Sequence, residues 1–232
     1  MNVTSGALAI FVAIYGHLTL AATLILVGMI FDFFDGFAAR LLHVKSEMGK
    51  ELDSLADMVT FGMAPTVLAH FLVLGVLPGN SISYFSEWTV WQQIMFFCPL
   101  VIPGFSAYRL AKFNLDVRQS MSFIGVPTPA NALFWVSLVF GAAYTPEIYQ
   151  YLFGNVTVLG FSAVILSVLL ISELPMFSLK VTGLGWKENK IRYLYFATLI
   201  VLGCVFGKDV IVFIIPVYIL FNIIKALTTS NR

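Results

Sequence analysis

The chain has 232 residues, of which 59% are hydrophobic and 11% are charged, and its mean hydropathy is +0.93. These values exclude an ordinary soluble domain, and we expect no nucleic-acid partner. The net charge of +1 says little, because the distribution of the charges carries the information. Several apolar runs approach or exceed the roughly 18–20 residues that cross a bilayer as a helix. We therefore predict an all-α, polytopic transmembrane bundle, and a single domain over 1–232 because no linker-like segment divides the chain.

About eight helices are predicted in chain order, with turns or helix-breaking residues between them. Their ranges are 2–15, 18–44, 49–77, 90–113, 128–146, 154–179, 190–206 and 208–227. Gly16 and His17 form a tight turn, the run 78–81 stops the third helix, and Pro127 and Pro129 open the fifth.

Basic residues gather at the connections after the second, fourth and sixth predicted helices and near the C-terminus. Lys208 alone falls on the other side. By the positive-inside rule, the basic side faces the cytoplasm. We therefore predict an integral membrane protein with both termini on that side.

The most informative residues are four aspartates, Asp32, Asp35, Asp53 and Asp57, within or beside apolar helical stretches. A carboxylate near the bilayer costs roughly 2.5–3.5 kcal/mol on insertion scales. Helical spacing places Asp32 and Asp35 on one face of the second helix, and Asp53 and Asp57 on one face of the third. Since the two helices are consecutive and antiparallel, the acidic faces can meet across one cleft toward the cytoplasmic side.

Hard oxygen ligands in this number suit Mg²⁺ or Mn²⁺ better than zinc, and a pair of such ions can clamp a phosphoryl group. Two alternatives remain open on the residues alone. One is a structural charge network with Arg40, Lys45 and Lys50, and the other is the ion pathway of a divalent-cation transporter.

A longer pattern surrounds the aspartates: D-x2-D-G-x2-A-R-x8-G-x3-D-x3-D. Its fixed positions are Asp32, Asp35, Gly36, Ala39, Arg40, Gly49, Asp53 and Asp57. This pattern resembles the signature of the CDP-alcohol phosphotransferase family, membrane enzymes that make phospholipids.

The resemblance implies a role for each motif residue. Asp32, Asp35 and Asp53 would hold two divalent cations at the diphosphate of a CDP-linked lipid. Asp57 would complete the metal shell and act as general base on the acceptor hydroxyl. The nucleotide and CDP-lipid side would be formed by Gly36, Ala39, Arg40 and Gly49, of which Gly36 and Ala39 make room for the cytidine moiety.

Downstream runs, over 108–114, 123–130 and 173–180, are similar to the bacterial phosphatidylserine synthases within that family. This similarity implies transfer of the phosphatidyl group of CDP-diacylglycerol to the hydroxyl of L-serine, with release of CMP. Glycerol 3-phosphate or inositol as the acceptor remains an alternative. Arg109, Lys112 and Asn114 are candidates for binding the serine carboxylate or the diphosphate.

The resemblance further implies a homodimer among membrane lipids, in the bacterial cytoplasmic membrane with its active site toward the cytoplasm. Lys112 stands where the family has arginine, and Glu173 has no assigned role. The family's first segment carries a Pro-Asn-x-x-Thr run that binds the nucleotide. We expect this chain to begin inside that segment, with Asn2 at a later asparagine of it.

Overall fold

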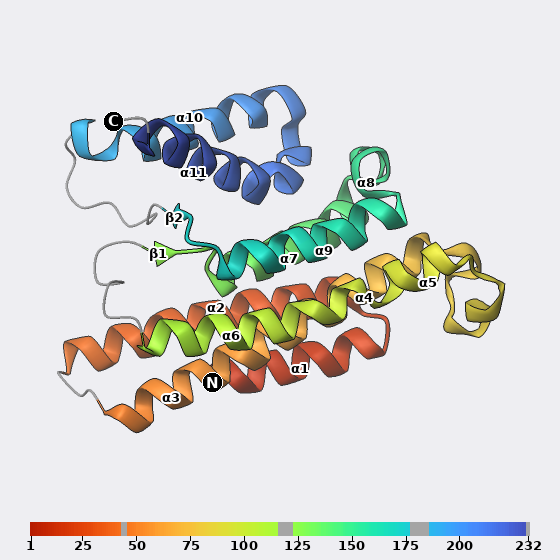
Figure 1. Ribbon diagram of the computed structural model, residues 1–232, viewed down its shortest axis with the longest axis horizontal. Helices are drawn as coiled ribbons and strands as arrows, with labels where there is room; N and C mark the ends of the chain where they lie inside the picture. Colours follow the sequence, from red (N-terminus) through yellow and green to blue (C-terminus); the bar gives the residue numbers. More distant parts are fainter. Residues whose placement is uncertain (43–45, 116–122, 177–185, 231–232) are drawn as a thin grey trace.

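The computed structural model describes residues 1–42, 46–115, 123–176 and 186–230, and in these it is an all-α bundle (Figure 1). The predicted fold class is confirmed. The second half of the run 173–180 and the predicted basic residue Lys45 lie outside the described residues.

The N-terminal half contains the long helices that carry the acidic motif. It comprises α1 (Asn2–Ile14), α2 (Leu18–Leu41), α3 (Glu47–Asp57), the π-helical turn η1 (Met58–Met63) and α4 (Ala64–Val76). Two short 3₁₀ turns, η2 (Pro78–Asn80) and η3 (Ile82–Glu87), then lead to α5 (Val90–Phe97), η4 (Cys98–Leu100) and α6 (Val101–Leu115). The predicted helices 49–77 and 90–113 are thus each one nearly continuous rod with a local change of helical pitch.

The C-terminal half adds the helices α7 to α9, a two-stranded ladder and a terminal hairpin. It comprises β1 (Phe123–Ile124), α7 (Thr128–Tyr144), α8 (Pro146–Phe153), α9 (Val156–Ile171), β2 (Pro175–Met176), α10 (Trp186–Phe206), η5 (Gly207–Phe213) and α11 (Ile214–Ser230). Pro129 lies in the first turn of α7, as predicted. The predicted helix 154–179 is too long, because Ser172 adopts extended backbone and Pro175 enters β2. The last helix begins six residues later than predicted, after the 3₁₀ turn η5.

Membrane-crossing helices account for most of the bundle. Within the described ranges, four helical stretches have the length and composition to cross a bilayer: Leu18–Ala39, Glu47–Val76, Val90–Leu115 and Asn189–Thr228. The bent pair α8 and α9, with 76° between its members, raises that number to five. The last stretch has 40 residues and folds back on itself as α10 and α11 (Figure 1), so it is long enough for two crossings. The protein is an integral membrane protein.

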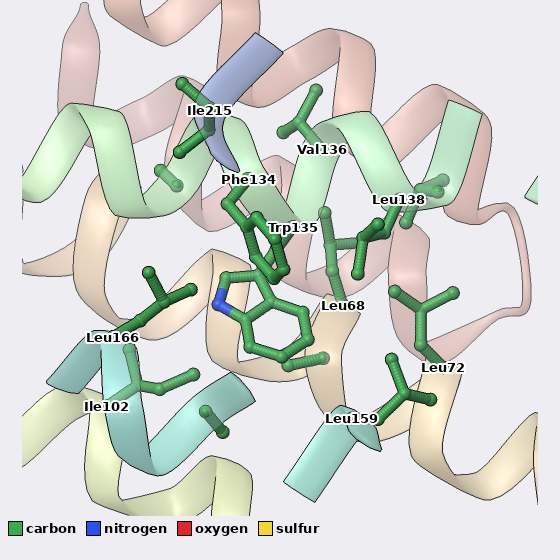
Figure 2. Close-up of a cluster of buried hydrophobic side chains, with 14 of the residues drawn as sticks. Leu68, Leu72, Ile102, Phe134, Trp135, Val136, Leu138, Leu159, Leu166 and Ile215 are labelled. Atoms are coloured by element: carbon green, nitrogen blue, oxygen red, sulfur yellow. The ribbon is translucent and has the colours of Figure 1, made fainter. Parts of the chain in front are cut away.

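The buried core lies around α7. Trp135 is fully buried and packs edge-to-face on Phe134, with ring centroids 5.1 Å apart. Leucines from α4 and α9 and Ile215 from α11 surround this pair (Figure 2). Because α7 contacts α2, α4 and α11, it joins the acidic helices to the terminal hairpin.

A small antiparallel ladder closes the end of the bundle where α7 begins and α9 ends. Phe123 pairs with Met176, and Ile124 pairs with Pro175. Gly125 follows with a φ of 75°, and a Cβ there would lie 2.5 Å from the carbonyl oxygen of Leu170. Only glycine fits this approach, which explains its place in the run 123–130.

Candidate functional site

The acidic ends of α2 and α3 form the candidate site. The two helices are consecutive, and α3 continues through η1 into α4. Asp32, Asp35 and Asp53 each offer one carboxylate oxygen, and these three oxygens lie within 4.8 Å of one another. Three carboxylates at this spacing can share one small cation. The predicted convergence of the two acidic faces is therefore seen in the structure.

Asp57 lies one helical turn beyond Asp53, at the C-terminus of α3, and is less exposed than Asp53. Its carboxyl group is adjacent to that of Asp32 but is not part of the three-oxygen cluster. The amide nitrogen Nδ2 of Asn2 donates to Oδ1 of both carboxylates, at 3.2 Å for Asp32 and 3.1 Å for Asp57. The quartet is thus a triad of candidate metal ligands with a fourth, partly buried carboxylate beside it.

Electrostatics support a bound cation at this cluster. Two like charges 4 Å apart repel by about 4 kcal/mol at an effective dielectric constant of 20. Within the described residues, none of the four aspartates forms an ion pair; the basic group of Lys50 instead donates to the carbonyl oxygen of Asn114 at 2.6 Å. The charge-network alternative therefore finds no support from Lys50. The side chain of Arg40 and the whole of Lys45 fall outside the described part. The donor set, all carboxylate oxygen, fits Mg²⁺ or Mn²⁺.

The small residues predicted for the nucleotide side differ in their surroundings. A Cβ on Gly36 would meet no atom of the described residues within 4 Å, so among these residues the space beside it is open. Ala39, one turn further on, is partly exposed. Gly49 has a local reason for being small, because a Cβ there would lie 3.0 Å from the oxygen of the Ser46 hydroxyl that caps α3. Their contact with a nucleotide stays a prediction.

Arg109 is directed into the protein. Its side chain is only 6% exposed, its Nε donates to the carbonyl oxygen of Val126 at 2.7 Å, and its guanidinium lies 5.8 Å from the ring centroid of Phe113. Asp57 and Tyr218 are its electrostatic neighbours. A buried guanidinium within electrostatic range of Asp57 can attract an anionic group to that place.

Lys112 and Asn114 serve as ties between elements. The Nζ atom of Lys112 forms an ion pair with Oε1 of Glu173 at 3.2 Å, which gives the previously unassigned glutamate a partner. The Nδ2 atom of Asn114 donates to Oγ of Ser54 at 2.9 Å, which fastens α6 to α3 beside the acidic cluster. The structure thus separates three residues that the sequence grouped together, and their binding roles stay predictions.

Close packing around Thr60 fixes the helices that hold the acids. Thr60 lies fully buried in η1, and a Cβ on Gly6 of α1 or Gly28 of α2 would approach its atoms to 2.3 and 2.6 Å. The backbones of α1 and α2 therefore approach η1 closely, because each has a glycine at the point of contact. Sequence reasoning missed both this contact and the π-helical turn that begins directly after Asp57. It also missed the contact of Asn2 with the acids; the only signal for Asn2 was its place in the family's first segment.

Comparison with known proteins gives one family and one recurring enzyme name. The profile of the CDP-alcohol phosphatidyltransferase family matches residues 1–171, which contain the acidic cluster and α1 to α9. A protein of Bacillus subtilis (strain 168) called CDP-diacylglycerol–serine O-phosphatidyltransferase is 39% identical over 145 residues, covering 62% of this chain and 73% of the relative. Proteins of the same name from Helicobacter pylori (strain 26695) and Saccharomyces cerevisiae are 31% and 39% identical over 225 and 129 residues. These alignments cover 95% and 52% of this chain, and 85% and 40% of the respective relatives.

Proposed function

Because the chain belongs to the CDP-alcohol phosphatidyltransferase family, we propose that it transfers the phosphatidyl group of CDP-diacylglycerol to the hydroxyl of L-serine. The products are phosphatidylserine and CMP. One observation carries the chemistry: three carboxylate oxygens of Asp32, Asp35 and Asp53 lie within 4.8 Å of one another, with Asp57 alongside. The choice of serine is supported by the names of the relatives from three organisms.

Asp57 is the general base of the proposed reaction. The serine oxygen attacks the phosphorus that carries diacylglycerol, the new P–O bond forms, and the bond from that phosphorus to the oxygen of CMP breaks. The serine proton passes to the carboxylate of Asp57, which must lie within hydrogen-bond reach of the hydroxyl. Asp57 is only partly exposed, which limits the contact of this carboxylate with bulk water.

Asp32, Asp35 and Asp53 would hold two divalent cations, Mg²⁺ or Mn²⁺, with Asp57 closing the shell. When bound, such ions neutralise the charge of the diphosphate and of the departing CMP. Arg109 supports recognition of the acceptor, because its buried positive charge interacts electrostatically with Asp57 and can attract the serine carboxylate. The cytidine end of the lipid would occupy the open space beside Gly36.

In this proposal the chain acts as one domain, and its aspartate cluster faces the cytoplasm of a bacterial cell. Lys50 and Lys112 support this orientation, because they lie at the same end of the bundle as the aspartates and the positive-inside rule assigns that end to the cytoplasm. The proposal also includes a homodimer among membrane lipids, on family resemblance alone. Size measurement of the purified protein in lipid nanodiscs tests that last part.

The test of the proposed function is the identity of the lipid formed. Purified protein is given CDP-diacylglycerol, Mn²⁺ or Mg²⁺, and either L-serine, glycerol 3-phosphate or inositol, and the lipid product and CMP are measured by mass spectrometry. We expect phosphatidylserine and an equal amount of CMP with serine. A lipid carrying one of the other alcohols would redirect the acceptor assignment. Uptake of divalent cation into vesicles without CMP release would contradict the proposed enzymatic activity.

A further inference from the structure

The start of α1 reaches the acidic site. With 13 residues, α1 is roughly 20 Å long, which is shorter than the hydrocarbon layer of a bilayer. It lies alongside only part of α2, and its N-terminus lies near the middle of the bundle, close to α3 (Figure 1). Asn2, its first residue, is therefore placed inside the protein, with 2% of its surface exposed.

The amide of Asn2 is suited to join two carboxylates. A carboxylate only accepts hydrogen bonds, whereas an amide NH₂ group has two hydrogens to donate. In the structure Nδ2 lies 3.2 Å from Oδ1 of Asp32 and 3.1 Å from Oδ1 of Asp57. One neutral group thus contacts a carboxylate on α2 and a carboxylate on α3, and it adds no further negative charge between them.

Asn2 is itself held in place from the other side. Its backbone carbonyl oxygen accepts a hydrogen bond of 3.1 Å from the hydroxyl of Thr60. Thr60 is in turn enclosed by the close approach of Gly6 and Gly28. A side chain anchored in this way can impose an orientation on its partners, because its own backbone has no room to move.

We propose that Asn2 is a positioning residue for Asp32 and Asp57. By occupying Oδ1 of both carboxylates, it leaves Oδ2 of Asp57 for the acceptor hydroxyl and Oδ2 of Asp32 for a divalent cation. Hydrogen-bonded partners that orient ligating carboxylates typically contribute 10–100-fold to metal affinity or activity. The inference rests on the proposed function, in which Asp57 is the base and Asp32 a metal ligand.

The test compares Asn2→Ala and Asn2→Asp with Ser5→Ala as a matched control. Ser5 lies one turn further along α1, is 5% exposed, and its Oγ donates to the carbonyl oxygen of Leu24 at 2.6 Å. Its removal therefore costs one buried hydrogen bond between α1 and α2 without contact to an aspartate. Asn2→Asp keeps the size of the side chain and the backbone bond to Thr60, but it removes both N–H donors and adds a negative charge beside the two carboxylates.

Four quantities are measured on the full-length protein: kcat, the serine KM, thermal stability, and Mn²⁺ binding by electron paramagnetic resonance without substrates. Both Asn2 variants should lose about 10–100-fold in kcat, and Asn2→Ala, which adds no charge, should also bind Mn²⁺ more weakly than wild type. Their serine KM should stay within about three-fold, since Arg109 is untouched. Ser5→Ala should keep kcat and Mn²⁺ binding within about three-fold while losing a similar amount of thermal stability.

The inference is overturned if either Asn2 variant folds and matches Ser5→Ala in both kcat and Mn²⁺ binding. Full activity of Asn2→Asp alone would also overturn the inference, because it would show that the Asn2 side chain only fills space. Failure of the proposed function gives a different result, since wild-type protein would then form no phosphatidylserine. The Mn²⁺ measurement separates the two, because it needs neither serine nor CDP-diacylglycerol.

Discussion

Each carboxylate of the acidic cluster has its own surroundings, although the sequence motif treats the four alike. Asp35 and Asp53 are exposed, and with Asp32 they bring three oxygens to within 4.8 Å. Asp57 is more enclosed, and Arg109 is among its electrostatic neighbours. This difference separates residues suited to holding a cation from one suited to accepting a proton.

Asp57→Asn tests that division directly. The substitution preserves shape but removes the basic oxygen, so we expect kcat to fall by about 10²–10⁴-fold. Mn²⁺ binding should stay within a few-fold, because the three clustered oxygens remain and the amide oxygen of the new asparagine can still close the metal shell. Asp35→Asn is the matched variant and should lose Mn²⁺ binding. Turnover that survives in Asp57→Asn would show that another group takes the serine proton.

Gly36→Ala tests whether the open space beside Gly36 serves the CDP-lipid. The new methyl group meets no atom of the part of the chain that the structure describes within 4 Å, and alanine is preferred over glycine in a helix by roughly 0.5–1 kcal/mol. We expect unchanged or higher thermal stability and at least a ten-fold higher KM for CDP-diacylglycerol. Gly203→Ala in α10 is the control, because it also meets nothing within 4 Å but lies outside the motif. An unaltered KM in Gly36→Ala would remove Gly36 from the nucleotide site.

The sequence predicted which aspartates come together, but it did not predict the hydrogen-bond and ion-pair partners of the other candidate site residues. Spacing along two helices was enough to bring the aspartates together. Arg109, Lys112 and Asn114 share one helix end, so they were grouped, yet their partners come from Val126, Glu173 and Ser54. Such contacts depend on the packing of distant segments, which helical periodicity does not encode.

The element that connects the acids to the core is the rod formed by α3, η1 and α4. The sequence predicted one continuous helix over 49–77, and only the π-helical turn at Met58–Met63 departs from it. Turns of this kind are frequent at functional sites. Here the turn begins right after Asp57 and contains Thr60, which contacts α1 and α2. The apolar pattern that predicted the helix does not distinguish one π-helical turn from the α-helix around it, so the turn was not predicted.

Gly6→Ala tests the contact among α1, α2 and η1. A Cβ at Gly6 would lie 2.3 Å from the hydroxyl oxygen and 2.7 Å from the Cα atom of Thr60, so α1 must shift. Overpacking of this kind typically costs 1–3 kcal/mol, and we expect a lower melting temperature together with lower kcat, since Asn2 moves with α1. Gly75→Ala in α4 is the control, because nothing lies within 4 Å of its Cβ. Equal melting temperatures for the two variants would contradict the close packing.

For the whole molecule, hydropathy alone predicted an all-α membrane protein, and the order of the main helices follows from it. The sequence did not separate α8 as a helix or predict the β1–β2 ladder, because elements of eight and two residues carry little periodic signal. The family profile ends at residue 171, yet α11 and η5 pack on α7. The terminal hairpin is therefore part of the same packed core, and Tyr218 brings it near Arg109.

In the proposed function, the aspartate cluster binds divalent cations on which phosphatidyl transfer to serine depends. The most direct measurement is a titration of metal-free enzyme with Mn²⁺, followed by electron paramagnetic resonance and phosphatidylserine formation in the same samples. We predict that two ions bind per chain, that activity returns in parallel with binding, and that Asp32→Asn loses both. Serine-dependent release of CMP from metal-free enzyme in the presence of EDTA would contradict the claim.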